Sequence, residues 1–165
     1  LSIDTVSSFL DGGCGRGANV FEAARRMGPE SDVIGLDLWD EVIEQLHTRK
    51  RDVKAENVRI VRADMGKELP LETGSVDMYF MATVFHDLVA DSVHPQALQE
   101  ALRVLKPGGT LALVEFYPVE EEKGPPVRIR LSPDKLQAML EEYGISMDIT
   151  EDVGRNLYLA AGRVG

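Results

Sequence analysis

The chain has 165 residues, of which 44% are hydrophobic and 28% are charged, and its formal net charge at pH 7 is −10. This length fits one domain, residues 1–165, with a core of its own, and the acidic balance disfavours a nucleic acid as partner. No apolar run approaches the ~20 residues that cross a bilayer, no signal-peptide pattern opens the chain, and the single cysteine excludes an internal disulfide. We therefore expect a cytoplasmic protein without a membrane partner.

Strand-like and helix-like patterns alternate along most of the chain. Short runs rich in β-branched residues indicate strands, and apolar residues at helical spacing indicate helices. The predicted elements, in chain order, are strand 8–11, helix 17–27, strand 32–37, helix 41–50, strand 57–63, strand 76–82, helix 95–105 and strand 110–116. The Lys-Pro-Gly-Gly turn at 106–109 is expected to end the last of these helices.

The remaining residues are predicted to form a long loop, a helix and a hairpin. Residues 117–131 are irregular, and because long loops in compact domains are often functional, we place this loop near the substrate side. Ser132 is expected to N-cap a helix that ends at Gly144. The closing hairpin is predicted from strands 145–150 and 156–160, with the turn at 152–155.

This alternation predicts an α/β fold: a Rossmann-like, doubly wound, mainly parallel sheet with helices on both faces. Parallel neighbours are joined by right-handed crossovers. In such a sheet the ligand lies at the carboxyl ends of the strands, where the strand order reverses. Side chains that follow these strand ends are therefore the first candidates for a binding site.

The glycine-rich stretch after the first strand is the most informative part of the sequence. Asp11 ends the strand, and Gly13, Gly15 and Gly17 alternate before the first helix. Glycine allows a tight turn and leaves no Cβ to hold a ligand away, and the N–H groups at a helix start favour an anionic or electron-rich ligand. The stretch predicts a nucleotide-type cofactor site. It fits the dinucleotide fingerprint G-x-G-x-x-G/A, through Ala18, as well as the pattern D-x-G-x-G-x-G.

Two further acids follow predicted strands. Asp37 ends the second strand, at the distance from the glycine turn where an acid commonly accepts both ribose hydroxyls, and capping of the following helix is a compatible second role. Asp64 ends the third strand, so that it shares one sheet edge with Asp37. Trp39 is interpreted either as a cover for the adenosine or as a packing residue. Cys14 is interpreted as a small residue of the cofactor turn rather than a nucleophile, because no histidine partner is evident.

The motif of residues 11–17 resembles that of the class I S-adenosylmethionine-dependent methyltransferases. Other segments resemble the small-molecule methyltransferases related to ubiquinone and menaquinone biosynthesis: the strand and His-Asp pair of 78–87, the Arg-Val-Leu-Lys-Pro-Gly-Gly run of 103–109, and residues 114–116 and 124–133. The resemblance covers nearly the whole chain from Asp11 to the closing hairpin. It is specific for the cofactor and the fold and weak for the substrate.

The resemblance implies transfer of a methyl group from S-adenosylmethionine to a small-molecule acceptor by in-line displacement, with S-adenosylhomocysteine as product. It also implies a seven-stranded sheet in which the last hairpin inserts the single antiparallel strand. In that family, an acid placed like Asp64 accepts from the adenine amine and the next residue, Met65, packs on the ring. The expected cofactor contacts are Asp11, Gly13, Cys14, Gly15, Gly17, Asp37, Leu38, Asp64, Met65 and Met81.

His86 is the candidate catalytic or substrate-orienting residue, because its pKa is ordinarily near neutrality and it follows the fourth strand. The alternative, a histidine that stabilises the loop, stays open. Arg128 and Arg130 are candidates for binding an anionic substrate. No metal site is predicted, because the spacing of the His and Asp residues around His86 matches no known ligand pattern.

Two other function classes stay open. An NAD(P)-binding oxidoreductase shares the early fold, but it does not account for Asp11, Gly17 and Asp64 together. A non-catalytic S-adenosylmethionine-binding module is the second. The resembled family usually carries helices before the first strand that roof the site, and almost nothing here precedes Ser8. Either a partner subunit, as in a homodimer, covers the site, or the preceding part has been lost, or the chain binds cofactor without efficient turnover.

Overall fold

The computed structural model describes residues 2–121 and 123–165, so Leu1 and Glu122, which fall in the predicted domain and in the predicted loop, lie outside the described residues. The described chain forms a seven-stranded sheet of order β3-β2-β1-β4-β5-β7-β6. The strands are β1 (Ser8–Gly12), β2 (Asp32–Asp37), β3 (Val58–Arg62), β4 (Val76–Ala82), β5 (Leu105–Phe116), β6 (Ile149–Gly154) and β7 (Leu157–Arg163). The helices are α1 (Ala18–Met27), α2 (Asp40–Val53), α3 (Phe85–Ala90), α4 (His94–Val104) and α5 (Pro133–Glu141), with short 3-10 helices η1 (Ile3–Thr5) and η2 (Val127–Ile129).

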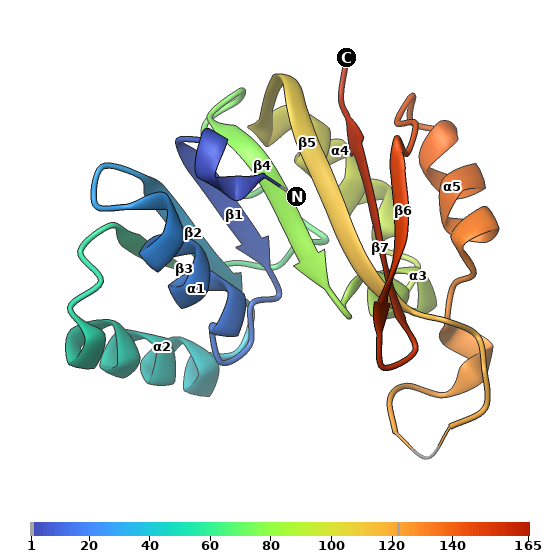
Figure 1. Ribbon diagram of the computed structural model, residues 1–165, viewed down its shortest axis with the longest axis horizontal. Helices are drawn as coiled ribbons and strands as arrows, with labels where there is room; N and C mark the ends of the chain where they lie inside the picture. Colours follow the sequence, from blue (N-terminus) through green and yellow to red (C-terminus); the bar gives the residue numbers. More distant parts are fainter. Residues whose placement is uncertain (1, 122) are drawn as a thin grey trace.

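Helices cover both faces of the sheet, as the predicted doubly wound fold requires (Figure 1). Successive residues of a strand point to opposite faces, and the buried neighbours Val33 and Ile34 of β2 accordingly belong to different core clusters. Val33 packs with Leu46 of α2 and with α1, whereas Ile34 belongs to the cluster that contains Leu98 of α4 and Leu136 of α5. Because both faces are buried, the central strands read as nearly continuous apolar runs.

The predicted closing hairpin and its single antiparallel strand are confirmed. β7 pairs antiparallel with β5, and β6 pairs antiparallel with β7. The predicted position of the hairpin turn is wrong, because β6 runs to Gly154 and the turn lies at Arg155 and Asn156. Both turn residues have positive φ, 55° and 57°, which is the backbone of a tight hairpin turn and is tolerated by asparagine better than by most residues.

Three other local differences concern the middle of the chain. The turn at 106–109 ends α4 as predicted, but it is already part of β5. The N–H of Gly108 donates to the carbonyl of Val164, and the N–H of Val164 donates to the carbonyl of Gly109. The helix α3 after β4 was not predicted, since six residues are too few to show a periodic pattern. The described residues of the segment 117–131, that is 117–121 and 123–131, are irregular as predicted, except for η2.

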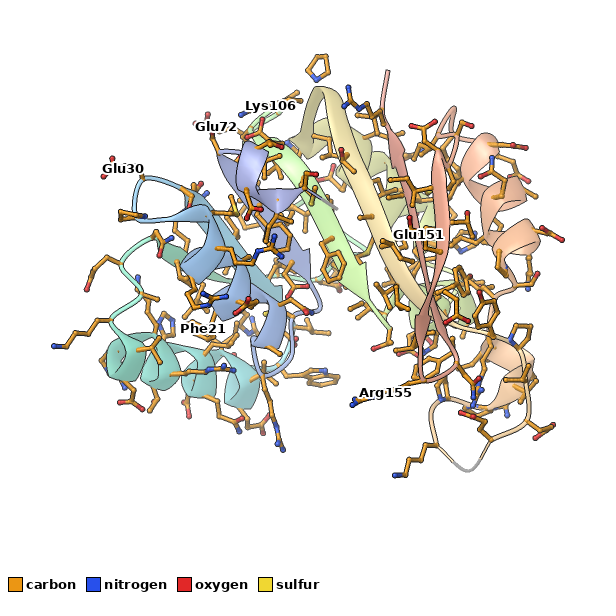
Figure 2. All side chains as sticks on the ribbon, viewed as in Figure 1. Phe21, Glu30, Glu72, Lys106, Glu151 and Arg155 are labelled. Carbon is orange, nitrogen blue, oxygen red and sulfur yellow. The ribbon has the colours of Figure 1, made fainter. Side chains whose placement is uncertain are left out.

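The strand order reverses between β1 and β4, which pair in parallel with each other and with β2 and β5 on their other sides. The carboxyl ends of these strands lie together at one edge, the lower edge in Figure 1. Figure 2 shows Lys106 at the opposite edge, where β4 and β5 begin, and Arg155 near the edge where they end. Lys106 Nζ lies 2.8 Å from Asp77 Oδ1, so this ion pair stabilises the sheet far from the reversal point.

Candidate functional site

The turn between β1 and α1 brings main-chain donors to the reversal point. Gly13 has φ +68°, and a Cβ there would lie 2.7 Å from Val84, so this position accepts only glycine without a shift of its neighbours. Gly15 has φ +50°, but a Cβ there would meet no atom of the described residues within 4 Å. Gly17 is the N-cap of α1. The turn is therefore packed on one side and open at Gly15, where a ligand would approach.

Asp37 holds this turn against the end of β2. Its Oδ2 accepts a hydrogen bond from the N–H of Gly15 at 2.9 Å, and its Oδ1 accepts from the N–H groups of Leu38 at 2.8 Å and Trp39 at 3.2 Å. The sequence predicts two roles for Asp37, to accept the ribose hydroxyls and to cap α2. The bond to Gly15 adds a third role, which the sequence did not reveal. Each carboxylate oxygen has two lone pairs, so these three bonds fill Oδ1 and leave one acceptor site, on Oδ2, for a ligand.

Asp11 is buried at the end of β1, with only 1% of its surface exposed. No donor in residues 2–121 or 123–165 hydrogen-bonds to its Oδ2. Burial raises the pKa of Asp11 to about 7, the contact with the Asn19 side chain partly opposes the rise, and the nearby charge of Asp37 adds to it. A buried carboxylate without a partner is costly, so this atom favours a cationic or donor group in the site.

Cys14 packs inside the turn. Its N–H donates to the carbonyl of Leu36 at 3.0 Å, and its Sγ is the second nearest atom to a Cβ built at Gly35. Burial, followed by the charges of Asp11 and Asp37, raises the pKa of the thiol well above its ordinary value. These contacts support the interpretation of Cys14 as a packing residue and not a nucleophile.

We expect the native Cys14 thiol to react with 5,5′-dithiobis(2-nitrobenzoic acid) at pH 8 at least about 100-fold more slowly than the thiol of the urea-unfolded chain, because the thiolate is the reactive form. The measurement is the rate of thionitrobenzoate release in each state. Because Cys14 is the only cysteine, a single phase is expected. Equal rates in the two states would contradict its buried, protonated placement.

Asp64 and Met65 follow β3 at the same edge. Asp64 Oδ1 accepts from the N–H of Gly66 at 2.9 Å, and Oδ2 lies 3.4 Å from Lys67 Nζ. Met65 packs across the glycine turn, since its Sδ would lie 2.9 Å from a Cβ on Gly12. The predicted role of Asp64 toward the adenine amine stays a prediction, and its place at the carboxyl end of β3, next to Met65, is consistent with that role.

The predicted contacts Leu38, Met81 and the nearby Trp39 differ in exposure. Leu38 is 40% exposed and Trp39 is 63% exposed, which is unusual for large apolar side chains directly after a buried strand. Met81 is buried in the core cluster with Phe85. Its side chain is therefore part of the core, and its predicted contact with the cofactor stays a prediction.

His86 lies in the first turn of α3 and is buried against β5. Its Nδ1 is 2.7 Å from Glu115 Oε2, and its main-chain N–H donates to Glu115 Oε1 at 3.2 Å. Its Nε2 is 3.5 Å from Asp87 Oδ1. Burial opposes the charged imidazole, but the hydrogen bond to Glu115 and the charges of Glu115 and Asp87 outweigh it, so the pKa of His86 is raised.

Sequence reasoning missed the partner of His86. Glu115 is fully buried within the apolar run Leu-Ala-Leu-Val-Glu-Phe of β5. A lone acid in such a strand must find a donor when it is buried. That single charged position was the available signal for a buried pair.

The two arginines of the loop differ sharply. The guanidinium of Arg130 is buried and donates to the carbonyls of Pro125 at 2.9 Å, Val119 at 2.7 Å and Lys123 at 3.0 Å. It also lies 5.3 Å from the centre of the Phe116 ring. These contacts hold the loop together, and a role toward a substrate stays a prediction for Arg130 and for the exposed Arg128.

Comparison with known proteins decides the family. A model described as a methyltransferase domain matches residues 9–109. The chain belongs to this methyltransferase family. It is 32% identical to the demethylmenaquinone methyltransferase of Lactococcus lactis subsp. lactis, over 67% of this chain and 42% of that protein. It is 30% identical to the 27-O-demethylrifamycin SV methyltransferase of Amycolatopsis mediterranei, over 94% of this chain and 60% of that protein.

Among solved structures, the crystal structure of a SAM-dependent methyltransferase from Aquifex aeolicus superimposes with a TM-score of 0.89 at 26% identity, covering 96% of this chain and 82% of that one. The chain spans less than two thirds of the length of either curated relative. No helix in the described part of this methyltransferase domain is long and apolar enough to cross a membrane. The described residues also contain no group of three His, Cys, Asp or Glu side chains that could hold a metal ion.

The site fits S-adenosylmethionine on features of its own. A buried carboxylate oxygen of Asp11 has no partner among the described residues, and the backbone is open at Gly15. Asp37 offers an acceptor, and the exposed side chains of Leu38 and Trp39 offer an apolar surface beside it. A cationic amino acid group, a ribose and an aromatic base are complementary to these three features.

Proposed function

We propose that this methyltransferase domain transfers a methyl group from S-adenosylmethionine to a small-molecule acceptor. The observation that carries the proposal is the placement of Asp11, Asp37 and Asp64 at the carboxyl ends of the neighbouring strands β1, β2 and β3, with the open glycine turn after β1 at the point where the strand order reverses. When bound, S-adenosylmethionine supplies a methyl group on a positively charged sulfur, which is already a good leaving group. The protein therefore mainly positions the two substrates and excludes water.

We assign the parts of S-adenosylmethionine to residues at three strand ends. Asp11 is assigned to the ammonium of the methionyl part, because its unpartnered oxygen is buried. Asp37 is assigned to the ribose: the free lone pair of Oδ2 accepts one hydroxyl, and a second hydroxyl takes the place of one of the N–H donors on Oδ1. Asp64 and Met65 are assigned to the adenine, with Trp39 and Leu38 against the adenosine. Because the N–H groups of Cys14, Gly15 and Gly17 already donate to Leu36, Asp37 and Cys14, the methionyl carboxylate is assigned to the N–H groups of Gly13 and Arg16.

The acceptor is proposed from chemistry and relatives together. Two relatives that match two thirds or more of this chain are named as methyltransferases of demethylmenaquinone and of 27-O-demethylrifamycin SV, both small molecules. The formal net charge of −10 also disfavours a nucleic-acid acceptor. A cytoplasmic location and a homodimer stay predictions.

Asp11 gives the proposal a pH-dependent signature. Its folded pKa of about 7 lies above the ordinary 3.8, so Asp11 favours the folded cofactor-free protein at low pH, and this contribution is lost as the pH rises from about 4 through about 7. A bound cationic ligand lowers the pKa of Asp11 again, because it stabilises the carboxylate. Binding at pH 7 should therefore release about half a proton per cofactor.

The proton release is measured by calorimetry of S-adenosylmethionine binding at pH 7 in two buffers with different ionisation enthalpies. The matched control is Asp11→Asn, which keeps the shape and removes the titration, so its release should be close to zero. The same release from wild type and variant would show that Asp11 does not face the cationic group.

The activity itself is tested by incubating the protein with S-adenosylmethionine and a panel of phenols, quinols, thiols and amines, and measuring S-adenosylhomocysteine formed above the acceptor-free rate. Acceptor-dependent product supports the enzyme. Tight binding of both cofactor forms with no transfer to any acceptor would favour the non-catalytic binding module, and binding of NAD alone would favour the oxidoreductase.

A further inference from the structure

A groove of about 650 Å³ lies between α1 and α2. Both helices pack on the same face of the sheet through one core cluster, which contains Val20 of α1 and Leu46 of α2. Their C-terminal ends are apart in Figure 1, and the loops that follow the two helices line the far end of the groove. The volume is in the range of small-molecule sites in proteins. None of the residues assigned to the cofactor lines this groove.

The walls of the groove are apolar. Phe21 and Ala24 of α1 are buried along one side, whereas Val53, the last residue of α2, lines the other side and is 56% exposed. The end of α1 needs no further partner, because Asn57 Nδ2 donates to the carbonyls of Ala24 at 3.0 Å and Gly28 at 2.8 Å. The groove therefore offers an apolar surface that a ligand would remove from water.

The rim of the groove carries more positive than negative charge, although the formal net charge of the chain is −10. Arg25, Arg49 and Lys54 line it, against the carboxylates of Glu22 and Glu56. Arg25 and Glu22 bind each other at 2.7 Å. Within residues 2–121 and 123–165, no carboxylate forms an ion pair with Arg49 or Lys54. Two cations of the rim can therefore bind an anion.

Arg49 is the better placed of these two cations. Its Nη1 donates to the carbonyl of Arg16 at 2.8 Å, and its guanidinium lies 4.6 Å from the centre of the Phe21 ring. A guanidinium has five N–H donors, so this bond leaves others for an anion. Because the contact with the ring already orders the side chain, binding an anion costs little additional side-chain entropy.

We propose that the groove between α1 and α2 is a second ligand site, which binds a small amphipathic anion. The apolar body of this ligand contacts Phe21 and Val53, and its carboxylate or sulfonate binds Arg49. A neutral ligand would take Arg49 and Lys54 out of water without replacing their hydrogen bonds. An inorganic anion would leave the apolar walls uncovered. The two features together therefore favour an amphipathic anion.

Two contacts connect the groove with the cofactor turn. A Cβ on Gly17 would lie 2.8 Å from the Phe21 ring, and Arg49 binds the carbonyl of Arg16, whose own N–H is assigned to the methionyl carboxylate. A hydrogen bond between two ions is stronger than one to a neutral carbonyl, so an anion in the groove draws the guanidinium away from Arg16. We expect the anion to weaken S-adenosylmethionine binding, and the cofactor to weaken anion binding by the same factor. This coupling, unlike the site itself, rests on the proposed function.

The site is tested with 8-anilinonaphthalene-1-sulfonate, whose fluorescence rises in an apolar site, and with its uncharged analogue N-phenyl-1-naphthylamine. We expect one sulfonate per chain and at least about tenfold weaker binding of the analogue, because it lacks the charge that Arg49 binds. Equal affinities of the two dyes, or no saturable binding of the sulfonate, would overturn the site. This comparison uses wild type and decides the site even if a variant fails to fold.

Two variants locate the bound dye. Arg49→Gln removes the cation, and Val53→Glu adds a negative charge at an exposed position, so each should weaken sulfonate binding at least about tenfold. Arg51→Gln is the matched control, because Arg51 is an exposed arginine of the same helix that binds Thr48 and does not line the groove. It should bind the sulfonate like wild type. Wild-type affinity in either groove variant, or an equal loss in Arg51→Gln, would contradict the assignment to this groove.

The coupling is tested by calorimetric titration of S-adenosylmethionine with and without saturating sulfonate. The cofactor Kd should rise at least about fivefold in wild type and stay unchanged in Arg49→Gln. An unchanged Kd in wild type would overturn the coupling. So would a rise that persists in Arg49→Gln, because the dye would then compete at the cofactor turn itself. Failure of S-adenosylmethionine to bind at all would contradict the proposed function and the coupling with it, whereas the dye titrations still decide the groove.

Discussion

Replacement of Asp37 by alanine is expected to weaken S-adenosylmethionine binding by about two orders of magnitude. Hydrogen bonds to a charged group contribute roughly 1.5–3 kcal/mol each, and a loss of about 2.7 kcal/mol corresponds to about 100-fold in Kd. The variant also loses the bond from Gly15 that shapes the turn, so the effect combines a lost ligand contact with a looser site. The measurement is calorimetric Kd together with the quenching of Trp39, the only tryptophan of the chain.

Two variants separate these contributions. Asp37→Asn keeps an acceptor oxygen for the N–H of Gly15 and removes the charge, so it should bind more weakly than wild type but more tightly than Asp37→Ala. Asp40→Ala removes an exposed carboxylate of α2 that pairs with Arg62, and it should bind like wild type. A folded Asp37→Ala protein with wild-type affinity would refute the ribose assignment.

Replacement of His86 by asparagine is expected to lower methyl transfer to a hydroxyl acceptor by about 100-fold or more, the usual contribution of a general base. Asparagine keeps a donor for Glu115, whereas alanine would leave that buried carboxylate without its ring partner and endanger the fold. Cofactor affinity should stay within about twofold of wild type, because His86 is not among the assigned cofactor contacts. The measurement compares kcat and cofactor Kd in the same preparations.

The control for this variant is His47→Asn on α2, which removes another histidine outside the site and should keep both constants. Equal turnover of His86→Asn and wild type would show that the role of His86 is purely structural. A parallel loss of cofactor binding and turnover would show that the substitution disturbs the turn through Val84 rather than the proton transfer.

The parallel part of the fold could be predicted from the sequence because its strands are buried on both faces and lie between clear turns. β2 and β4 match their predicted bounds. The boundaries of β6 could not be predicted in the same way, since all but one of its residues are exposed and nothing in their pattern fixes the register. The turn at Arg155 and Asn156 was hidden by Gly154, which reads as the stronger turn signal.

The family and the fold are confirmed. Of the acids of the candidate site, Asp11 is the last but one residue of β1, Asp37 is the last of β2, and Asp64 comes two residues after β3. What the sequence could not reveal are contacts between distant segments. Glu115 meets His86 only because β5 lies beside β4, and Arg130 folds back onto carbonyls of its own loop. Such pairings depend on tertiary packing, which local patterns do not encode.

Calorimetric titration of the protein with S-adenosylmethionine, S-adenosylhomocysteine and NAD shows directly which cofactor the glycine turn binds. We predict micromolar binding of the first two, accompanied by a change in Trp39 fluorescence, and no binding of NAD. Binding of NAD in place of the other two would contradict the proposed methyl transfer.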